Sequence, residues 1–268
     1  MTKCLFLFAL LLAGCVAAPA PLPTVEVGAT QTAAPTVMGA PDAQLFASLE
    51  PGPSLSPTID VEPAPSPSAS PPTGPAIAAG TYSVAALLDL LPVAIELRTG
   101  YDRDLFETWI DANGDGCNAR KEVLLRDAVV APTVGAKCAL TGGQWVSPYD
   151  GQVFNDASLV QIDHVVALAE AWDSGASMWD STRRTLFAND LSLPWSLLGV
   201  SGATNEDKGD KDPADWLPPR SEFVCTYLGD WLSIKVTWRL AIDQREKDAI
   251  AAHAECAPTT TRVSASRP

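Results

Sequence analysis

The stretch that decides the fold is Leu159-Val160-Gln161-Ile162-Asp163-His164-Val165-Val166, within the best strand candidate of the chain, residues 158–166. Most of its apolar residues are β-branched, which favours a strand. His164 is one of only two histidines in the sequence, and it directly follows a carboxylate at the end of the apolar run. A carboxylate beside an imidazole at a strand end can hold a metal and a base in one small volume.

Two polar motifs follow this strand. The first is Asn189-Asp190-x-Ser192-Leu193, and the second is Asn205-x-x-Lys208. On composition alone, His164 is better explained as a buried structural histidine at a strand end. The ordered set of Asp163, His164, Asn189, Asn205 and Lys208 favours a catalytic histidine instead.

This ordered set resembles the HNH, or His-Me finger, nucleases, and in particular an exported bacterial branch related to the C-terminal nuclease domain of GmrSD-type restriction enzymes. The likeness runs through most of the segment after residue 80. It includes Gly100-Tyr101-Asp102-Arg103, Cys117-x-x-Arg120-x-Glu122-Val123-Leu124 and Trp216-Leu217-Pro218-Pro219. The resemblance implies an α+β fold with a ββα-metal core and additional helices.

The resemblance also implies a role for each motif residue. His164 would deprotonate the attacking water, and Asn189 would hydrogen-bond the loop backbone and fix the orientation of the histidine. Asp163 and Asn205 would bind one divalent metal through oxygen atoms, which favours Mg²⁺ or Mn²⁺. Asn205 stands where the pattern usually has its last histidine, which lowers metal affinity. Three cations would contact phosphate groups of the substrate: Lys208, Lys211 and Arg120.

A second motif, Asp111-x-Asn113-x-Asp115-Gly116 with Glu122 at the twelfth position, matches an EF-hand calcium loop. Oxygens at the first, third, fifth and twelfth positions of such a loop surround one Ca²⁺. A solvated acidic turn is an equally good interpretation, because Cys117 is expected to form a disulfide inside the loop. The sequence leaves both readings open.

The start of the chain, MTKCLFLFALLLAGC, has one basic residue, a short apolar run and small residues, which is typical of an export signal. Leu12-Ala13-Gly14-Cys15 resembles a lipobox, so residues 1–14 are predicted to be a signal peptide and Cys15 a lipidation site. An ordinary signal peptide is the alternative. Residues 15–80, rich in Pro, Ala, Ser and Thr, are predicted to be a disordered tether. The predicted nuclease domain spans residues 81–257. Residues 258–268 are predicted to form a C-terminal tail.

Four cysteines remain after the signal peptide and Cys15, an even number that fits an exported protein. Three pairings are possible, and Cys117–Cys138 with Cys225–Cys256 close the shortest loops. A structural zinc site is disfavoured, since the chain has no Cys-x-x-Cys pair. We therefore predict two disulfides in the nuclease domain.

The formal net charge of the chain is −14, of which the segment up to residue 85 contributes only −4. A strongly acidic domain argues against tight, non-catalytic DNA binding. It is compatible with a nuclease in which a few cations and a divalent metal supply the positive field. We expect cleavage of DNA, with RNA as a candidate second substrate, outside the cytoplasm and with little sequence preference. The protein is expected to be a monomer on the cell surface, attached to the membrane only through its lipid.

Two other functions fit parts of the sequence. The first is a surface lipoprotein that uses an inactive nuclease fold to bind a partner. The second is a calcium-stabilised hydrolase of cell-wall glycans that works through carboxylate pairs. The intact set of Asp163, His164 and Asn205 counts against the first of these. An activity that survives loss of His164 but not loss of an Asp/Glu pair would favour the second.

Periodicity predicts the remaining elements. A hairpin is expected from 144–146 and 152–154, and a short strand at 195–200. Thr204 is expected to cap the helix that carries Asn205. Helices are expected at 85–97, 103–110, 121–128, 167–172, 179–188, 204–211, 223–240 and 243–256.

Overall fold

The computed structural model describes residues 74–267. The predicted signal peptide, the lipidation site Cys15 and the tether up to residue 73 lie outside these described residues. Within the described range, no helix has the length and apolar character needed to cross a membrane.

The described residues contain both helices and strands, as the sequence predicts. The α-helices are α1 (Val84–Leu90), α2 (Ala119–Asp127), α3 (Leu168–Asp173), α4 (Ser181–Ala188), α5 (Gly202–Lys208), α6 (Ser221–Trp238) and α7 (Gln244–Ala252). The strands are β1 (Gly80–Ser83), β2 (Thr133–Val134), β3 (Leu140–Thr141), β4 (Trp145–Val146), β5 (Val153–Phe154), β6 (Val160–His164), β7 (Leu197–Ser201) and β8 (Thr260–Val263). The strands pair two by two: β1 with β8, β2 with β3, β4 with β5 and β6 with β7.

Strands β6 and β7 form an antiparallel pair that leads directly into helix α5. His164 lies opposite Leu197 in this pair, and Val160 lies opposite Ser201. The hydroxyl of Ser201 accepts a hydrogen bond from the Thr204 backbone N–H. Ser201 therefore caps α5, and the prediction that Thr204 is the cap was wrong by three residues. The chain thus runs strand, strand, helix through the segment that carries the motif residues.

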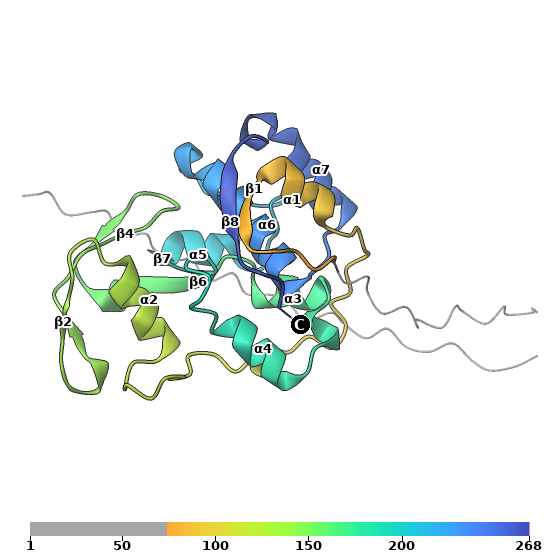
Figure 1. Ribbon diagram of the computed structural model, residues 1–268. Helices are drawn as coiled ribbons and strands as arrows, with labels where there is room; N and C mark the ends of the chain where they lie inside the picture. The colour runs from red at the N-terminus through yellow and green to blue at the C-terminus, as the bar shows by residue number, and fades with distance from the viewer. Residues whose placement is uncertain (1–73, 268) are drawn as a thin grey trace, which may run out of the picture. The chain divides into compact units, whose positions relative to one another are not determined.

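The β6–β7 pair lies between two apolar clusters. The smaller cluster joins α2 to the pair through residues such as Val123, Leu124 and Trp145. The larger cluster contains the buried faces of α1, α3 and α6. Figure 1 shows α2, β2 and β4 on one side of β6 and β7, with α1, α6 and α7 on the other. The strand that carries Asp163 and His164 is therefore supported from both sides.

A buried ionic network connects α3, α6 and α7 inside the larger cluster. The Lys235 ammonium lies 2.7 Å from the Glu170 carboxylate and 2.6 Å from the Glu246 carboxylate, and all three side chains are buried. The two carboxylates raise the pKa of Lys235 above its usual value, although burial acts in the opposite direction. Removing one partner of such a network leaves an uncompensated buried charge, so its members are expected to be sensitive to substitution.

Both predicted disulfides, Cys117–Cys138 and Cys225–Cys256, are confirmed in the structure. The first joins the start of α2 to the short 3₁₀ helix η2 (Ala136–Cys138), and the second joins α6 to the 3₁₀ helix η5 (Ala254–Cys256). The paired cysteines are separated by 21 and 31 residues along the chain.

Three predicted helices are shorter than expected, and that at 243–256 is reduced to α7, which ends at Ala252. The helix predicted at 85–97 ends at Leu90, because Pro92 disfavours helical geometry in the residue before it. The helix predicted at 103–110 is reduced to the 3₁₀ helix η1 (Arg103–Leu105). Beyond it Trp109 adopts a left-handed backbone conformation, with φ of 61°. That conformation is unfavourable for a bulky residue and requires support from its surroundings.

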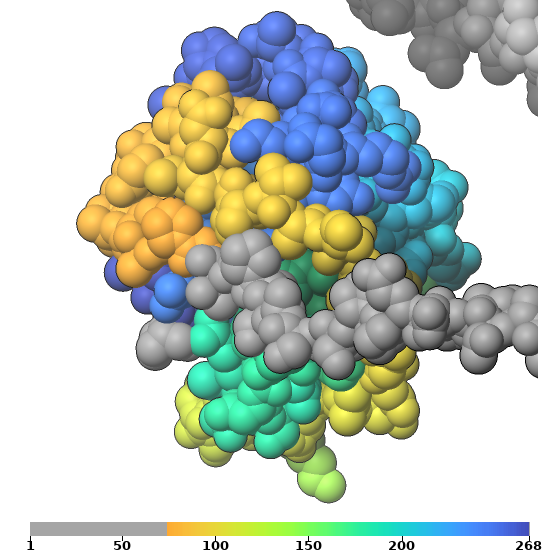
Figure 2. All heavy atoms as spheres, turned by 90° about the vertical axis from the view of Figure 1, so that its right-hand side faces the viewer, coloured from red at the N-terminus to blue at the C-terminus, as the bar shows by residue number. Residues whose placement is uncertain are grey.

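The residues predicted to form a tail belong to the folded unit. Thr260–Val263 form β8, which pairs antiparallel with β1, so that Gly80 lies opposite Val263. Three of these four residues are β-branched, which favours a strand, and Val263 is buried. Figure 2 shows the orange and gold surface of the first described residues directly beside the blue surface of the C-terminal elements. The prediction that residues 258–268 form a tail is therefore wrong for Thr260–Val263, which form β8.

Asp230 provides a test of this packing, because it is buried on α6 next to β8. Burial raises the pKa of Asp230 to about 7, and a hydrogen bond with Thr261 acts in the opposite direction. A carboxyl whose folded pKa is raised holds its proton in the folded state between pH 4 and 7 and releases it on unfolding. The protonated carboxyl thus contributes to the free energy of unfolding at low pH. This contribution to stability is lost as the pH rises, by up to about 1.4 kcal/mol per pH unit.

We expect Asp230→Asn to stabilise the protein relative to wild type at pH 8, by about 1–4 kcal/mol. At pH 4 the two proteins should have nearly the same free energy of unfolding. Urea denaturation at pH 4, 6 and 8 measures the difference. An equal difference in free energy of unfolding at all three pH values would contradict the prediction. It would show that the pKa of Asp230 is not raised and that β8 does not bury this residue.

Candidate active site

His164, at the end of β6, is buried and held by one hydrogen bond. Its Nε2 atom lies 2.9 Å from the backbone oxygen of Ala188. Because a carbonyl oxygen only accepts, Nε2 carries the proton and Nδ1 is left as the acceptor of the ring. Burial lowers the pKa of His164 to about 4, so the imidazole is neutral at pH 7. The arrangement is that of a base rather than of an acid.

Asn189 follows Ala188 at the end of α4 and anchors a neighbouring segment. Its Oδ1 accepts from the Ile110 N–H at 3.0 Å, and its Nδ2 donates to the Glu107 carbonyl at 2.7 Å. The anchored segment contains Trp109, whose ring centre lies 5.5 Å from that of His164. Asn189 thus supports the left-handed turn at Trp109 and, through it, one face of the histidine ring.

Asp163 is also buried, and each of its carboxylate oxygens has a partner. Tyr149 donates its hydroxyl to Oδ2 at 2.6 Å, and Lys208 donates to Oδ1 at 2.9 Å. Burial raises the pKa of Asp163 above its usual value, although Lys208 and Tyr149 act in the opposite direction. Each carboxylate oxygen has more than one lone pair, so a further contact on the open side of the group is chemically allowed.

Lys208 was predicted to contact phosphate, but in the structure its side chain is buried and paired with Asp163. Its side chain has no exposed surface, and its ammonium bonds both Asp163 and, at 3.0 Å, the backbone oxygen of His164. A buried ammonium that is already paired cannot reach a substrate without breaking this pair. Lys208 therefore fastens α5 to β6 instead of lining the open site.

Asn205 lies on α5 and meets Asp163 and His164 at one cavity of about 260 Å³. Its Nδ2 donates to the Gln161 side chain at 2.7 Å, which leaves its amide oxygen available for another partner. The polar residues that line the cavity are Tyr101, Arg103, Asp163, His164, Asn205 and Asp210. The structure thus brings together the predicted base and both predicted metal ligands.

Two other predicted substrate contacts do not line this cavity. Lys211 is exposed just beyond the end of α5, and its ammonium lies 3.6 Å from the Asp207 carboxylate. Arg120, on α2, donates to the backbone oxygen of Val160 at 2.9 Å, and so braces the start of β6. Their predicted contacts with phosphate gain no support from this geometry.

Three residues of the site escaped the prediction: Tyr149, Trp109 and Arg103. Tyr149 approaches from the turn between β4 and β5, and no spacing in the sequence relates it to Asp163. Trp109 is one of eight tryptophans, and nothing in its local sequence distinguishes it from a core residue. Arg103 had a signal, since it belongs to the quoted motif Gly100-Tyr101-Asp102-Arg103.

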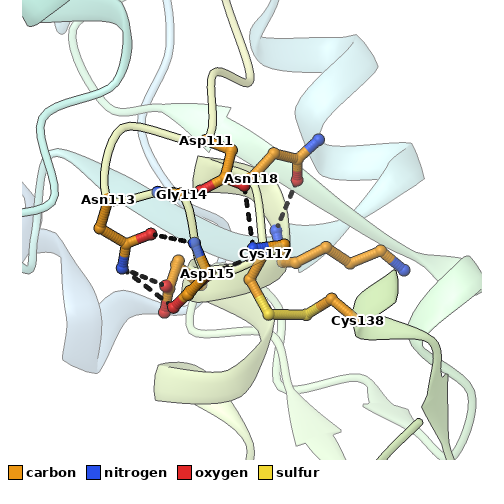
Figure 3. Close-up of a disulfide and its surroundings, with 10 residues drawn as sticks. Asp111, Asn113, Gly114, Asp115, Cys117, Asn118 and Cys138 are labelled. Carbon is orange, nitrogen blue, oxygen red and sulfur yellow. Dashed lines mark hydrogen bonds between the residues drawn. A yellow bond between two sulfur atoms is a disulfide. The ribbon is translucent and has the colours of Figure 1, made fainter. Parts of the chain in front are cut away.

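Figure 3 shows three residues of the predicted calcium loop, Asp111, Asn113 and Asp115, beside the Cys117–Cys138 disulfide. Asp111 accepts backbone N–H bonds from Gly114 and Gly116, each at 2.9 Å. The Asn113 amide nitrogen contacts the carboxylates of Asp115, at 2.9 Å, and Glu122, at 3.5 Å. Calcium binding by Asp111, Asn113, Asp115 and Glu122 stays a prediction.

Other carboxylates of the described residues are also close enough to share a cation. One group is Glu96, Glu170 and Glu246, and the other is Glu96, Asp212 and Asp243. The first group already surrounds the Lys235 ammonium, whose positive charge opposes a metal ion. Neither group contains a residue of the His164 cavity.

Comparison with known proteins agrees with this geometry. A family described as "GmrSD restriction endonucleases, C-terminal domain" matches residues 135–253, which include β6, α4 and α5. An uncharacterized secreted protein of Arthroderma benhamiae (strain ATCC MYA-4681 / CBS 112371) is 45% identical over 151 residues, which cover 56% of this chain and 72% of that protein. No solved structure matches the chain.

The chain belongs to the family of the GmrSD restriction endonuclease C-terminal domain. The family points to a nuclease-type hydrolase in general. The relative comes from a fungus, so the resemblance extends beyond the exported bacterial proteins that the sequence motifs suggest.

The role of Lys208 can be tested with a matched control at a nearby lysine just beyond the end of α5. We expect Lys208→Met to lower the free energy of unfolding by about 3–5 kcal/mol, because Asp163 would remain buried without its cation. Lys211→Met removes an exposed lysine one turn away and should change stability by less than about 0.5 kcal/mol. Equal effects in chemical denaturation of the two variants would contradict the buried ion pair.

Proposed function

We propose that this protein is a metal-dependent endonuclease that hydrolyses phosphodiester bonds of DNA outside the cytoplasm, with RNA as a candidate second substrate. One observation carries the proposal. A neutral histidine, oriented through Nε2 by the Ala188 carbonyl, shares a cavity with two oxygen donors, Asp163 and Asn205. Membership of a family described by restriction endonucleases supports the same chemistry.

In the proposed mechanism His164 is the general base. Its Nδ1 would accept a proton from the water that attacks phosphorus, while Nε2 keeps its hydrogen bond to Ala188. The charge of the resulting imidazolium would be partly offset by this carbonyl and by the anionic phosphodiester in the cavity. Trp109, held through Asn189, would limit rotation of the ring and so keep Nδ1 in place.

Asp163 and Asn205 would hold the divalent metal. Carboxylate and amide oxygens suit a hard cation, and the Asn205 oxygen is left open because its nitrogen is bonded to Gln161. When bound, Mg²⁺ or Mn²⁺ would supply positive charge against the negative charge that develops on the phosphate oxygens. Lys208 offsets part of the Asp163 charge, so we expect weak metal affinity.

The segment β6–β7–α5 would then be the ββα-metal core. Its order of two antiparallel strands and one helix, with His164 on the first strand and Asn205 on the helix, supports this assignment. The remaining helices would form a scaffold around it.

Export is supported by two observations. The relative from Arthroderma benhamiae is described as secreted, and both disulfides require an oxidising compartment to form and persist. Attachment of the chain to a membrane through a lipid on Cys15 remains part of the proposal.

The two histidines of the chain allow a matched test of the mechanism. We expect the wild-type protein, with its disulfides intact, to cleave plasmid and single-stranded DNA with Mg²⁺ or Mn²⁺ and not with EDTA. His164→Ala should lower the cleavage rate by about 10²–10⁴-fold. His253→Ala should leave it unchanged, because His253 lies outside the cavity and its side chain bonds, among the described residues, Glu255 alone.

Cleavage at the same rate by His164→Ala and wild type would remove His164 from the mechanism. If wild type cleaves neither DNA nor RNA with any divalent metal, the inactive fold that binds a partner becomes the better explanation. Circular dichroism of both variants checks that the fold is retained.

A further inference from the structure

The cavity at His164 has little positive charge for a site that would bind nucleic acid. Of the described residues that line it, Arg103 alone is a lysine or arginine. Lys208, the predicted phosphate contact, is paired with Asp163, and Lys211 and Arg120 lie outside the lining. Among the described residues, an anion that enters the cavity can therefore contact one cationic side chain, that of Arg103.

Arg103 has no carboxylate partner among residues 74–267, although the protein is strongly acidic. Its neighbour Asp102 uses its carboxylate to accept the Asp104 backbone N–H at 2.9 Å. Arg98, five residues earlier, is by contrast paired with both Asp173 and Asp210. The Arg103 guanidinium is exposed and lies near the Tyr101 hydroxyl, and both residues line the cavity.

Arg103 is also close enough to act electrostatically on the proposed base. Its positive charge is one of the causes that lower the pKa of His164. A group bound between Arg103 and His164 would thus contact the cation on one side and the base on the other. This is the position in which a phosphodiester must lie if Nδ1 of His164 is to activate a water against it.

We propose that Arg103 binds the non-bridging oxygens of the phosphodiester that is cleaved, and that recognition of the substrate is concentrated on this one phosphate. This inference rests on the proposed function of the same cavity. The planar guanidinium offers a pair of parallel N–H donors that match two phosphate oxygens, which a lysine cannot reproduce. The acidic surroundings disfavour contacts with phosphates farther along the strand.

Binding can be measured without cleavage, using a fluorescent thymidine hexanucleotide in EDTA. We expect Arg103→Gln to raise the dissociation constant by about tenfold to a hundredfold, as for the loss of a charge-assisted hydrogen bond. Arg103→Lys should lie between this variant and wild type. Arg262→Gln, an exposed arginine on β8 outside the cavity, should bind like wild type. Thermal unfolding of each variant checks its fold.

Salt dependence gives a second readout. One phosphate contact to a single strand predicts a slope of about 0.7 in a plot of log Kd against log salt concentration for wild type, and a slope near zero for Arg103→Gln. Binding by Arg103→Gln within twofold of wild type, a much steeper wild-type slope, or no wild-type binding would overturn the inference. Cleavage with Mg²⁺ or Mn²⁺ is scored separately. Normal binding with no cleavage would overturn only the proposed nuclease activity.

Discussion

The ion pair between Lys208 and Asp163 is the interaction on which the rest of the site depends. It joins the helix after β7 to the strand that carries His164, and it does so at a point where water is excluded. The same ammonium bonds the backbone of His164, so the position of His164 is coupled to the position of α5. Tyr149 completes the arrangement from a third segment. A buried carboxylate with such partners cannot move far without losing a hydrogen bond. The elements that form the cavity walls are therefore held in fixed positions relative to one another.

Much of this region follows from local sequence, and the reasons for the exceptions are physical. The strand at Asp163 and His164, the hairpin at 144–154 and both disulfides follow from β-branched residues, turn residues and loop length. The sequence predicts a phosphate contact for Lys208, because a short polar helix does not reveal which of its charged residues is buried. Periodicity over seven residues is too weak to distinguish the two faces. The contact with Tyr149 depends on tertiary packing, which no local pattern encodes.

The distribution of charge is compatible with the anion site proposed for this acidic protein. Most of the basic side chains near the site are committed to carboxylates or backbone oxygens: Lys208 to Asp163, Arg98 to Asp173 and Asp210, and Arg120 to Val160. The neutral state of His164 removes a further positive charge. The cavity is therefore organised by hydrogen bonds and packing, with its electrostatic attraction concentrated at one position instead of spread over a basic surface.

The pairing of β1 with β8 has a consequence for the timing of folding. Gly80 and Val263 are neighbours in the sheet, yet nearly the whole folded unit separates them along the chain. Closure of such a long loop is entropically costly, and chains dominated by distant contacts fold slowly. The final sheet cannot form on a ribosome that has not yet released β8. A polypeptide that stays open for this long suits a transport channel that accepts only unfolded chains.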